Sequence, residues 1–257
     1  MGDYMKALIT GASTGLGKDF AIKLSKLGYD IVAVARSKDK LELLKEKINT
    51  NLNIEVMDLS DINNVYKLHK KYTGKIDLLI NNSGFGECGE FIKTDLDKEL
   101  NMIDLNVKTL HILTKLFVQD FVKQDKGQIL NVASSAAFQP GPLMATYYAT
   151  KSYVYNLTMA IYEELRHEKS NVKISVLCPG PVDTEFSKRA NVKFKLKELS
   201  SDEVTEYTIK QLNKNKLIIV PGLFMKISVS LNRFVSRKFV LKIIYKIQKR
   251  KLSKEKK

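Results

Sequence analysis

Seven short apolar runs recur along the chain, and longer helical patterns separate them. The runs are rich in Ile, Val and Leu, and they do not alternate with polar residues as a half-exposed strand does. Strands that are buried on both faces of a parallel sheet have this pattern. The sequence therefore predicts strands at residues 6–10, 30–35, 53–57, 76–81, 128–134, 173–177 and 216–220.

The stretches between these strands have the spacing of helices. We expect helices at residues 15–27, 38–48, 62–72, 96–122, 147–167 and 201–212. This alternation predicts an α/β fold with a doubly wound parallel sheet flanked by helices. Because no linker or internal repeat interrupts the pattern, we expect one domain over residues 1–221, with an appendage over 222–257.

The composition excludes several classes of protein and site. Apolar residues make up 44% of the 257 residues and charged residues 28%, which is typical of globular proteins and not of disordered or collagen-like chains. Cys88 and Cys178 give no disulfide framework and no zinc spacing, and the three histidines are scattered, so no metal site is predicted. No signal-peptide pattern opens the chain, so a cytoplasmic protein is expected.

A glycine-rich turn at residues 10–17 follows the first strand and opens the first helix. Gly11 permits a sharp turn, while Gly15 and Gly17 permit close approach of a phosphate and close packing of the helix. The helix N-terminus would then bind a pyrophosphate. The alternative is a purely structural turn. The expected nucleotide contacts are Gly11, Ser13, Thr14, Gly15, Leu16 and Gly17.

The end of the second strand distinguishes between two nucleotides. An acidic residue there would bind a ribose 2′-hydroxyl, but the sequence has Arg36 and Ser37 instead. The guanidinium of Arg36 offers a planar donor fork for a 2′-phosphate. The sequence therefore predicts NADP(H) over NAD(H), the alternative being a solvated arginine at a helix start.

Polar residues also follow the third and fourth strands. The carboxylate of Asp58 can accept the adenine amino group, or it can belong to the N-cap region of the next helix, ahead of Ser60 and Asp61. The fourth strand ends at the carboxyl edge of the sheet, where ligands bind in such folds. Further cofactor contacts are thus expected from Asp58, Leu59, Asn82, Ser83 and Gly84.

Tyr147 and Lys151 are four residues apart, which places them on one face of a helix. An ammonium beside a phenol lowers the phenol pKa, and such a tyrosine can pass a proton to a carbonyl oxygen near neutral pH. Ser134 lies thirteen residues before Tyr147. Without these partners, Tyr147 would be interpreted as a half-buried aromatic residue.

In this order, the motifs resemble those of the short-chain dehydrogenase/reductase family over about residues 5–185. The resemblance implies a Rossmann-type fold, a nicotinamide cofactor and redox chemistry between a carbonyl and an alcohol. Ser83 is a departure, because the family usually has alanine there. Residues 84–91 look like those of a bacterial branch related to long-chain 3-oxoacyl and hydroxysteroid reductases. The motifs are the 10–17 turn, Asp58, the 81–84 turn, Asn106, Ser134, Tyr147 with Lys151, and Pro179 with Gly180.

The resemblance also implies roles for the catalytic residues. Tyr147 is the general acid in reduction and the general base in oxidation. Lys151 lowers its pKa and binds the nicotinamide ribose, and Ser134 donates a hydrogen bond to the substrate oxygen. Asn106 holds a water that links Lys151 to solvent. Pro179, Gly180, Val182 and Thr184 contact the nicotinamide end.

The expected reaction is hydride transfer between NADP(H) and an apolar ketone or secondary alcohol, such as a 3-oxoacyl chain or a steroid-like alcohol. The alternative is a catalytically silent NADP(H)-binding sensor or scaffold on the same fold. By resemblance, a homodimer or homotetramer is expected. Residues 185–199 are interpreted as a mobile lid over the substrate, with a plain surface loop as the alternative.

The C-terminal segment is strongly basic. Residues 216–257 hold 13 Lys and Arg and one acidic residue, Glu255, and apolar residues are dense between them. One interpretation is an interfacial helix that makes peripheral contact with an anionic membrane. A second is a lid or oligomer contact over the substrate cleft, and a third is a helix packed on the domain with a solvated Lys-rich end. Nucleic acid is not expected, because no recognition motif accompanies the charge.

Overall fold

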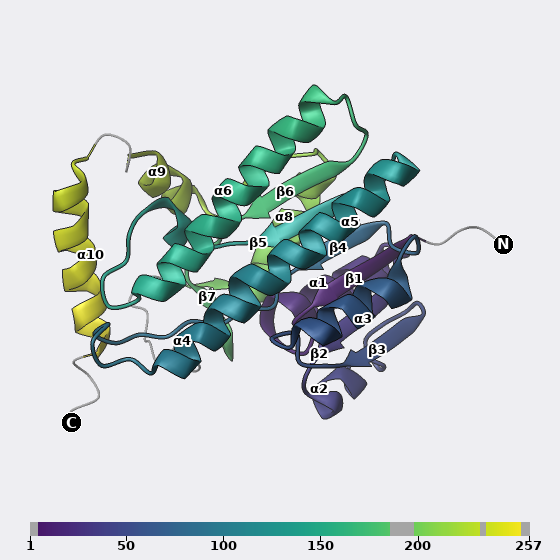
Figure 1. Cartoon of the computed structure of the whole chain (residues 1–257), viewed down its shortest axis with the longest axis horizontal. Coiled ribbons are helices and arrows are strands. Elements are labelled where there is room, and N and C mark those ends of the chain that lie inside the picture. The colour runs from purple at the N-terminus through teal and green to yellow at the C-terminus, as the bar shows by residue number, and fades with distance from the viewer. Residues whose placement is uncertain (1–4, 186–197, 232–234, 253–257) are drawn as a thin grey trace.

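The computed structural model describes residues 5–185, 198–231 and 235–252 (Figure 1). One parallel sheet has the strand order β3-β2-β1-β4-β5-β6-β9, which confirms the predicted doubly wound architecture. The strands are β1 (Lys6–Thr10), β2 (Asp30–Ala35), β3 (Leu52–Val56), β4 (Leu78–Asn81), β5 (Gln128–Val132), β6 (Lys173–Leu177) and β9 (Ile218–Ile219). The strand order reverses between β1 and β4, and ligands bind at the carboxyl edge beside such a reversal.

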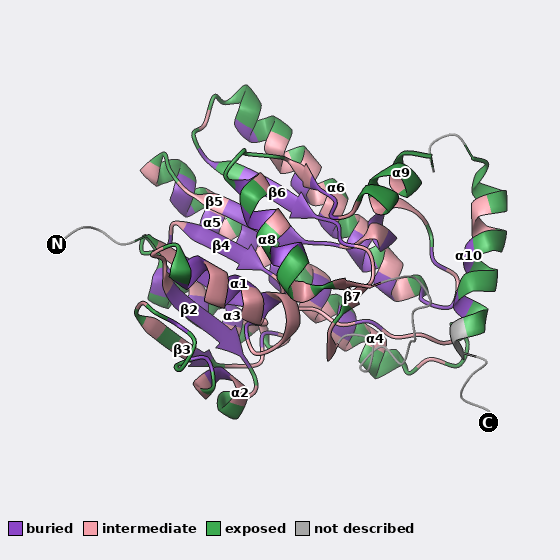
Figure 2. Ribbon diagram, turned by 180° about the vertical axis from the view of Figure 1, so that it is seen from behind, coloured by how far each residue is buried: buried purple, intermediate pink, exposed green. Residues whose placement is uncertain are grey.

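Helices cover both faces of the sheet (Figures 1 and 2). Phe20 and Val204 pack on one face, and Leu68, Phe117 and Leu165 pack on the other. The strands between these layers are largely buried (Figure 2), as the unbroken apolar runs predict. The helices are α1 (Gly15–Lys26), α2 (Lys38–Glu42), α3 (Ile62–Tyr72), α4 (Leu96–Ile103), α5 (Leu110–Gln124), α6 (Ala145–His167), α8 (Ser201–Leu212), α9 (Leu223–Leu231) and α10 (Arg237–Leu252).

Two of the expected helices differ from the structure. The expected helix at 96–122 is divided into α4 and α5 by a π-helical turn, Asp104–Thr109. The expected helix at 38–48 ends at Glu42, after which the chain continues in turns whose hydrogen bonds reach either the third or the fourth preceding residue. Leu44 and Ile48 are nevertheless buried. The turns therefore bury the same apolar residues whose spacing predicted a helix.

The carboxyl edge of the sheet has further short elements. β5 ends at Val132, two residues before its expected end, because Ser134 caps a 3-10 turn, Ser135–Phe138. The two short strands β7 (Val182–Asp183) and β8 (Leu199–Ser200) pair in parallel and were not expected. Both changes lie where the chain turns around the cleft described below.

The chain after β9 forms α9 and α10, which lie at the same end of the molecule (Figures 1 and 2). None of the residues of α9 is buried. In α10, Ile244 and Gln248 are the buried side chains among residues 237–250. This end of the molecule is therefore held to the body by few contacts.

Candidate active site

The glycine turn has the geometry that the sequence predicts. Gly11 and Gly15 have φ angles of +68° and +52°, in the left-handed region that favours glycine. A Cβ on Gly17 would lie 2.2 Å from the carbonyl oxygen of Gly11, so only glycine lets α1 approach the turn this closely. In the described structure no side chain caps the N-terminus of α1, and its first turn holds no acidic residue. The N–H groups of this turn are therefore suited to binding an anion.

Hydrogen bonds of Thr10 and Asn82 join the ends of β1 and β4. The Asn82 amide donates to the carbonyl oxygens of Thr10 and Gly11 at 3.0 and 3.2 Å. The Thr10 hydroxyl in turn accepts from the main-chain N–H groups of Asn82 and Ser83 at 2.9 and 3.0 Å. These bonds hold the glycine turn against the end of β4. The sequence motif contained Thr10, but its role was not identified from the sequence.

Arg36 and Asp58 form an ion pair, with 3.5 Å between Nη1 and Oδ2. The other oxygen of Asp58 accepts from the N–H and the hydroxyl of Ser60 at 2.9 and 2.8 Å. Burial raises the pKa of Asp58, but the Ser60 hydrogen bonds and the Arg36 charge outweigh burial, and the pKa lies below its ordinary value. Asp58 thus closes a turn, as the N-cap alternative expects. The Arg36 side chain remains 62% exposed, which leaves donors for a ligand.

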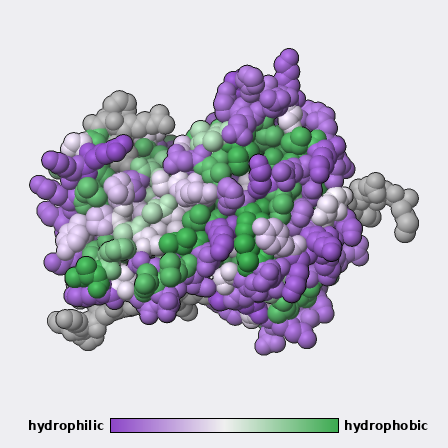
Figure 3. Space-filling view, viewed as in Figure 1, coloured by the Kyte–Doolittle hydropathy of each residue, from purple (hydrophilic) through white to green (hydrophobic). Residues whose placement is uncertain are grey.

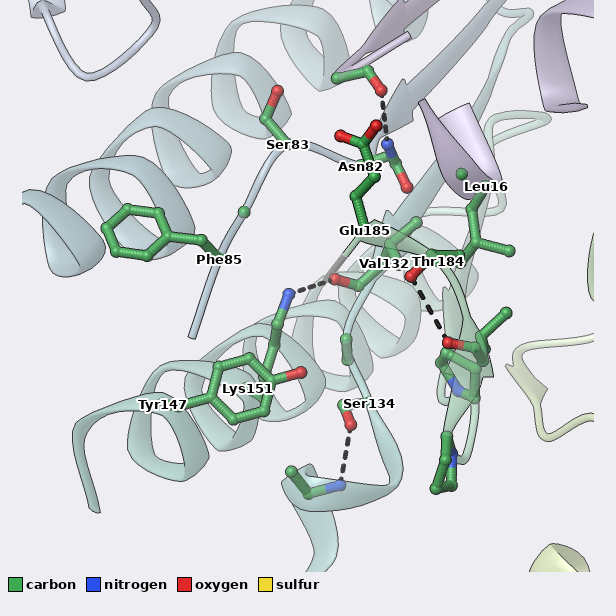
Figure 4. Close-up of a pocket in the computed structure, with 18 of the residues that line it drawn as sticks. Leu16, Asn82, Ser83, Phe85, Val132, Ser134, Tyr147, Lys151, Thr184 and Glu185 are labelled. Atoms are coloured by element: carbon green, nitrogen blue, oxygen red, sulfur yellow. Dashed lines mark hydrogen bonds between the residues drawn. The ribbon is translucent and has the colours of Figure 1, made fainter. Parts of the chain in front are cut away.

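Helix α6 holds Tyr147 and Lys151 one turn apart, and both side chains are buried (Figure 4). Ser134, two residues after β5, lies near enough to the phenol to lower its pKa through a side-chain hydrogen bond. Nζ of Lys151 donates to the carbonyl oxygen of Val132 at 3.0 Å and lies 5.9 Å from the centroid of the Tyr147 ring. The three residues that the sequence singled out therefore lie together.

The pKa of Tyr147 does not have the direction that the spacing predicts. Burial raises it, and the hydrogen bond with Ser134 only partly offsets burial. Burial also lowers the pKa of Lys151 to about 8. Lys151 is not among the groups that shift the pKa of Tyr147; it is itself desolvated, and its Nζ donates to Val132.

Asn106 lies in the π-helical turn, and π turns often occur at functional sites. Its Oδ1 accepts from the N–H of Phe85 at 3.1 Å. Its Nδ2 donates to the carbonyl oxygen of Phe85 at 2.9 Å and to Thr150 Oγ1 at 3.1 Å. The side-chain amide is thus used to hold the chain after Gly84. Its contact with a water stays a prediction.

Most of the predicted residues line one cleft of about 1360 Å³. Gly17 and Asn106 do not line the cleft. They lie behind it, where Gly17 packs against Gly11 and Asn106 binds the main chain of Phe85. Thr184 and Glu185 lie on the wall opposite Tyr147 (Figure 4), and Glu185 pairs with Lys40 at 2.7 Å. Most of the lid expected at 185–199 lies outside the described residues. The predicted residues that line the cleft are Gly11, Ser13, Thr14, Gly15, Leu16, Arg36, Ser37, Asp58, Leu59, Asn82, Ser83, Gly84, Ser134, Tyr147, Lys151, Pro179, Gly180, Val182 and Thr184.

Part of the remaining wall comes from the C-terminal segment, for which a lid over the substrate cleft was one of the three interpretations. Apolar side chains of α9 and α10 form part of its wall, and the hydroxyl of Tyr148 accepts a hydrogen bond from Gln248 of α10 at 2.8 Å. The C-terminal segment thus covers part of the cleft, as the second interpretation of that segment expects. Apolar lining residues that were not predicted include Phe85, Leu105, Met144, Phe224, Met225, Ile244 and Ile247.

Among the described residues, no group of three or more His, Cys, Asp or Glu side chains is placed to hold a metal ion. Across the same residues, every helix is too short or too polar to cross a bilayer. His69 instead pairs with Asp120 at 2.8 Å, and His111 with Tyr153 at 2.7 Å.

Comparison with known proteins gives a consistent result. Residues 5–194 match the family model of the short chain dehydrogenases. An uncharacterized oxidoreductase of Staphylococcus epidermidis is 31% identical over 84% of this chain and 96% of its own. The very-long-chain 3-oxoacyl-CoA reductase of Rattus norvegicus is 31% identical over 71% of this chain and 61% of its own. A solved structure of a short-chain dehydrogenase from Sphingobium yanoikuyae in complex with NADPH superposes with a TM-score of 0.79, at 28% identity over 85% of this chain and 88% of that one.

Proposed function

The chain belongs to the short-chain dehydrogenase family, and we propose that it transfers hydride between NADP(H) and an apolar ketone or secondary alcohol, with Tyr147 as general acid and base. The family makes the protein an oxidoreductase. One observation carries the proposed mechanism. Tyr147 and Lys151 are buried, and with the half-buried Ser134 they line the same cleft as the glycine turn.

The residues on the nucleotide side of the cleft fit a dinucleotide. The left-handed Gly11 and Gly15 and the uncapped first turn of α1 suit a pyrophosphate. Asp58 and Leu59 would hold the adenine, and Lys151 the nicotinamide ribose. Pro179, Gly180, Val182 and Thr184 would contact the nicotinamide, which supplies or accepts the hydride when it is bound.

Tyr147 would give its proton to the carbonyl oxygen in reduction and take it back in oxidation. The hydroxyl of Ser134, which lies beside the phenol, would donate a hydrogen bond to the substrate's carbonyl oxygen and stabilise the charge that develops there. With a pKa of about 8, Lys151 is mostly protonated at pH 7. Its ammonium therefore lies beside the phenol and stabilises the phenolate as the proton leaves.

We propose NADP(H) as the preferred cofactor because Arg36 and Ser37 line the cleft where β2 ends. Arg36 is exposed, and an acidic residue is absent from positions 36–38 of the described chain. The guanidinium fork suits the oxygens of a 2′-phosphate. The pairing of Arg36 with Asp58 aims it at the adenosine end of the cleft.

The substrate side of the cleft supports an apolar ketone. Phe85 and Met144 pack with Tyr147, and Met225 and Ile244 line the same cleft. One relative of this chain is named for its action on very-long-chain 3-oxoacyl-CoA. We therefore propose 3-oxoacyl or steroid-like substrates for this protein.

The test is oxidation of NADPH with a panel of ketones and 3-oxoacyl thioesters, with the Tyr147→Phe variant in parallel. The variant should lose roughly 100-fold or more in kcat, because its ring has no proton to donate, while its Kd for NADPH stays within about two-fold. Full activity of Tyr147→Phe would falsify the assignment of the acid. NADPH binding by the wild type without turnover of any carbonyl would favour the sensor or scaffold alternative.

We further propose that the protein works in the cytoplasm as a homodimer or homotetramer. Leu96, Leu100 and Ile103 form an exposed apolar face on α4, which would suit contact with a second copy. Light scattering after size-exclusion chromatography measures the assembly directly. A mass of one chain at micromolar concentration would contradict this part of the proposal.

A further inference from the structure

Helices α9 and α10 each expose a row of large apolar side chains. In α9 the row is Leu223, Ile227 and Leu231, and in α10 it is Phe239, Ile243 and Ile247. Members of each row are four residues apart, so they lie along one face of their helix. Apolar rows of this kind are unusual on a surface that water covers.

A cationic row runs beside the apolar row of α10. Lys238, Lys242 and Lys246 each precede a member of the apolar row by one residue, which separates the two rows by about 100° around the helix. On the other side of the apolar row, Ile244 and Gln248 are buried against the body. Around the circumference of α10, the buried residues are followed by the apolar row, and the apolar row by the cationic row. Figure 3 shows hydrophobic and hydrophilic side chains interleaved along this end of the molecule.

The loop before α4 adds apolar side chains beside α10. Phe91 and Ile92 are 66% and 87% exposed. Their neighbour Glu90 lies close enough to Lys249 of α10 for the two charges to interact. The loop thus lies near the C-terminal half of α10, as Figure 1 also shows.

We infer that α9, α10 and this loop form a surface that docks on an anionic lipid bilayer. Apolar side chains of an interfacial helix enter the boundary between headgroups and acyl chains, while lysines beside them bind anionic headgroups. Both kinds of side chain are arranged in adjacent strips on α10. Since no described helix can cross a bilayer, the protein would lie on the membrane surface.

The charge of the segment argues for lipid over a second copy of this chain. Residues 216–252 contain no acidic residue, whereas Lys and Arg recur throughout. A two-fold contact between copies of this surface would bring like charges together, which opposes association. A bilayer with anionic headgroups complements both the cations and the apolar rows.

The docking surface is continuous with the cleft. Phe224 and Ile247 are exposed and also line the cleft, and Arg250 lines it beside them. A bilayer bound to α9 and α10 would therefore lie at the mouth of the cleft. This geometry goes beyond the proposed reaction, and docking does not depend on any turnover.

The test is co-sedimentation of the full-length protein with phosphatidylcholine vesicles that contain or lack phosphatidylglycerol. The wild type should pellet with the anionic vesicles only, and added salt should weaken binding by screening. Phe239→Ser with Ile243→Ser, and separately Lys238→Glu with Lys242→Glu, should each lower the partition coefficient roughly ten-fold or more. Neither pair lines the cleft, so the affinity for NADPH should not change.

Matched controls lie far from this surface. Val122→Ser removes an exposed apolar side chain from α5, and Lys67→Glu with Lys70→Glu reverses two exposed charges on α3 (Figure 1). Equal loss of lipid binding in these controls would overturn the inference. Failure of the wild type to co-sediment with anionic vesicles would overturn it as well. Sedimentation velocity measures whether the same variants change the oligomeric state. If Phe239→Ser with Ile243→Ser dissociates an oligomer and leaves lipid binding unchanged, a second copy covers this surface and the inference is wrong.

Discussion

At the scale of single residues, Arg36 offers the sharpest prediction about the cofactor. Arg36→Asp removes a donor fork and places a negative charge near the expected 2′-phosphate. KM for NADPH should rise roughly 10- to 100-fold, the range that loss of a charge-assisted hydrogen bond gives, while KM for NADH should change little.

The control for this variant is Arg166→Asp, which reverses an exposed arginine at the end of α6. Steady-state kinetics with both cofactors make the comparison. An unchanged ratio of kcat/KM values for NADPH and NADH in Arg36→Asp would show that the cofactor preference, if there is one, arises elsewhere.

The lowered pKa of Lys151 predicts a pH dependence of stability. Its folded pKa is about 8, against an ordinary value of 10.5, so the unfolded chain binds more protons between these values. The contribution of Lys151 to stability therefore rises with pH from about 8 to 10.5, by about 3 kcal/mol. The raised pKa of Tyr147 acts in the opposite direction above pH 10, where the unfolded phenol loses its proton first.

Denaturant titrations at pH 7 to 10 would measure this effect as the difference between the wild type and Lys151→Met. The difference cancels the other titrating groups to first order. The stability advantage of Lys151→Met should be largest at pH 7 and shrink toward pH 10. An advantage that does not vary with pH would mean that Lys151 keeps an ordinary pKa in the folded protein.

At the scale of secondary-structure elements, the position of α10 depends on few contacts. Gln248→Leu removes the hydrogen bond to Tyr148, and the cleft wall should become less ordered. KM for an apolar ketone should rise roughly five-fold, as expected for one hydrogen bond, while kcat stays nearly the same. Tyr148→Phe should have a similar effect, and the double variant should be no worse than either one.

Steady-state kinetics of the three variants test this role, together with their melting temperatures. A large fall in kcat with KM unchanged would contradict it, because a residue that only positions the wall has no part in proton transfer. Gln248→Asn, which keeps the amide on a shorter stem, should restore part of the affinity.

The elements show which parts of the structure can be predicted from sequence. β1, the glycine turn and the start of α1 were predicted because short-range sterics decide them, with Gly11 and Gly17 at positions that exclude a Cβ. Tyr147 and Lys151 were predicted because the helical period brings them together. The division of 96–122 was missed, because the π turn is stabilised by distant contacts of Asn106 with Phe85 and Thr150.

The substrate wall was missed for a related reason. Tyr148 and Gln248 are one hundred residues apart in sequence, and no local pattern reports that they meet. The dense apolar residues of the C-terminal segment were consistent with a lid over the substrate cleft. They do not indicate which side chains would contact the cleft. The pKa of Tyr147 likewise depends on burial, which spacing alone does not determine.

At the scale of the whole molecule, the cleft draws residues from β2, β5 and α6 and from the segments that follow β1 and β4. A ligand that binds all of these elements only in the folded state stabilises the fold by mass action. At about 100 times its Kd, NADPH should add about 2.7 kcal/mol, which corresponds to roughly 5–10 °C in Tm for a chain of this length. Differential scanning fluorimetry measures the shift.

Tyr147→Phe should keep most of this shift, since the variant retains the glycine turn and Arg36. Absence of any shift with NADPH in the wild type would contradict the nucleotide site itself. A shift that NADH matches at equal concentration would contradict only the preference between the two cofactors.

The π-helical turn between α4 and α5 limits which insertions and deletions this chain can tolerate. A π-helical turn holds one residue more than an α-helical turn, so deleting one residue from Asp104–Thr109 would restore an ordinary α-helix and leave α4 and α5 in register. The shorter turn would no longer hold the Asn106 amide against Phe85 and Thr150. The length of this segment should therefore be invariant among functional descendants of the chain, even where its side chains vary.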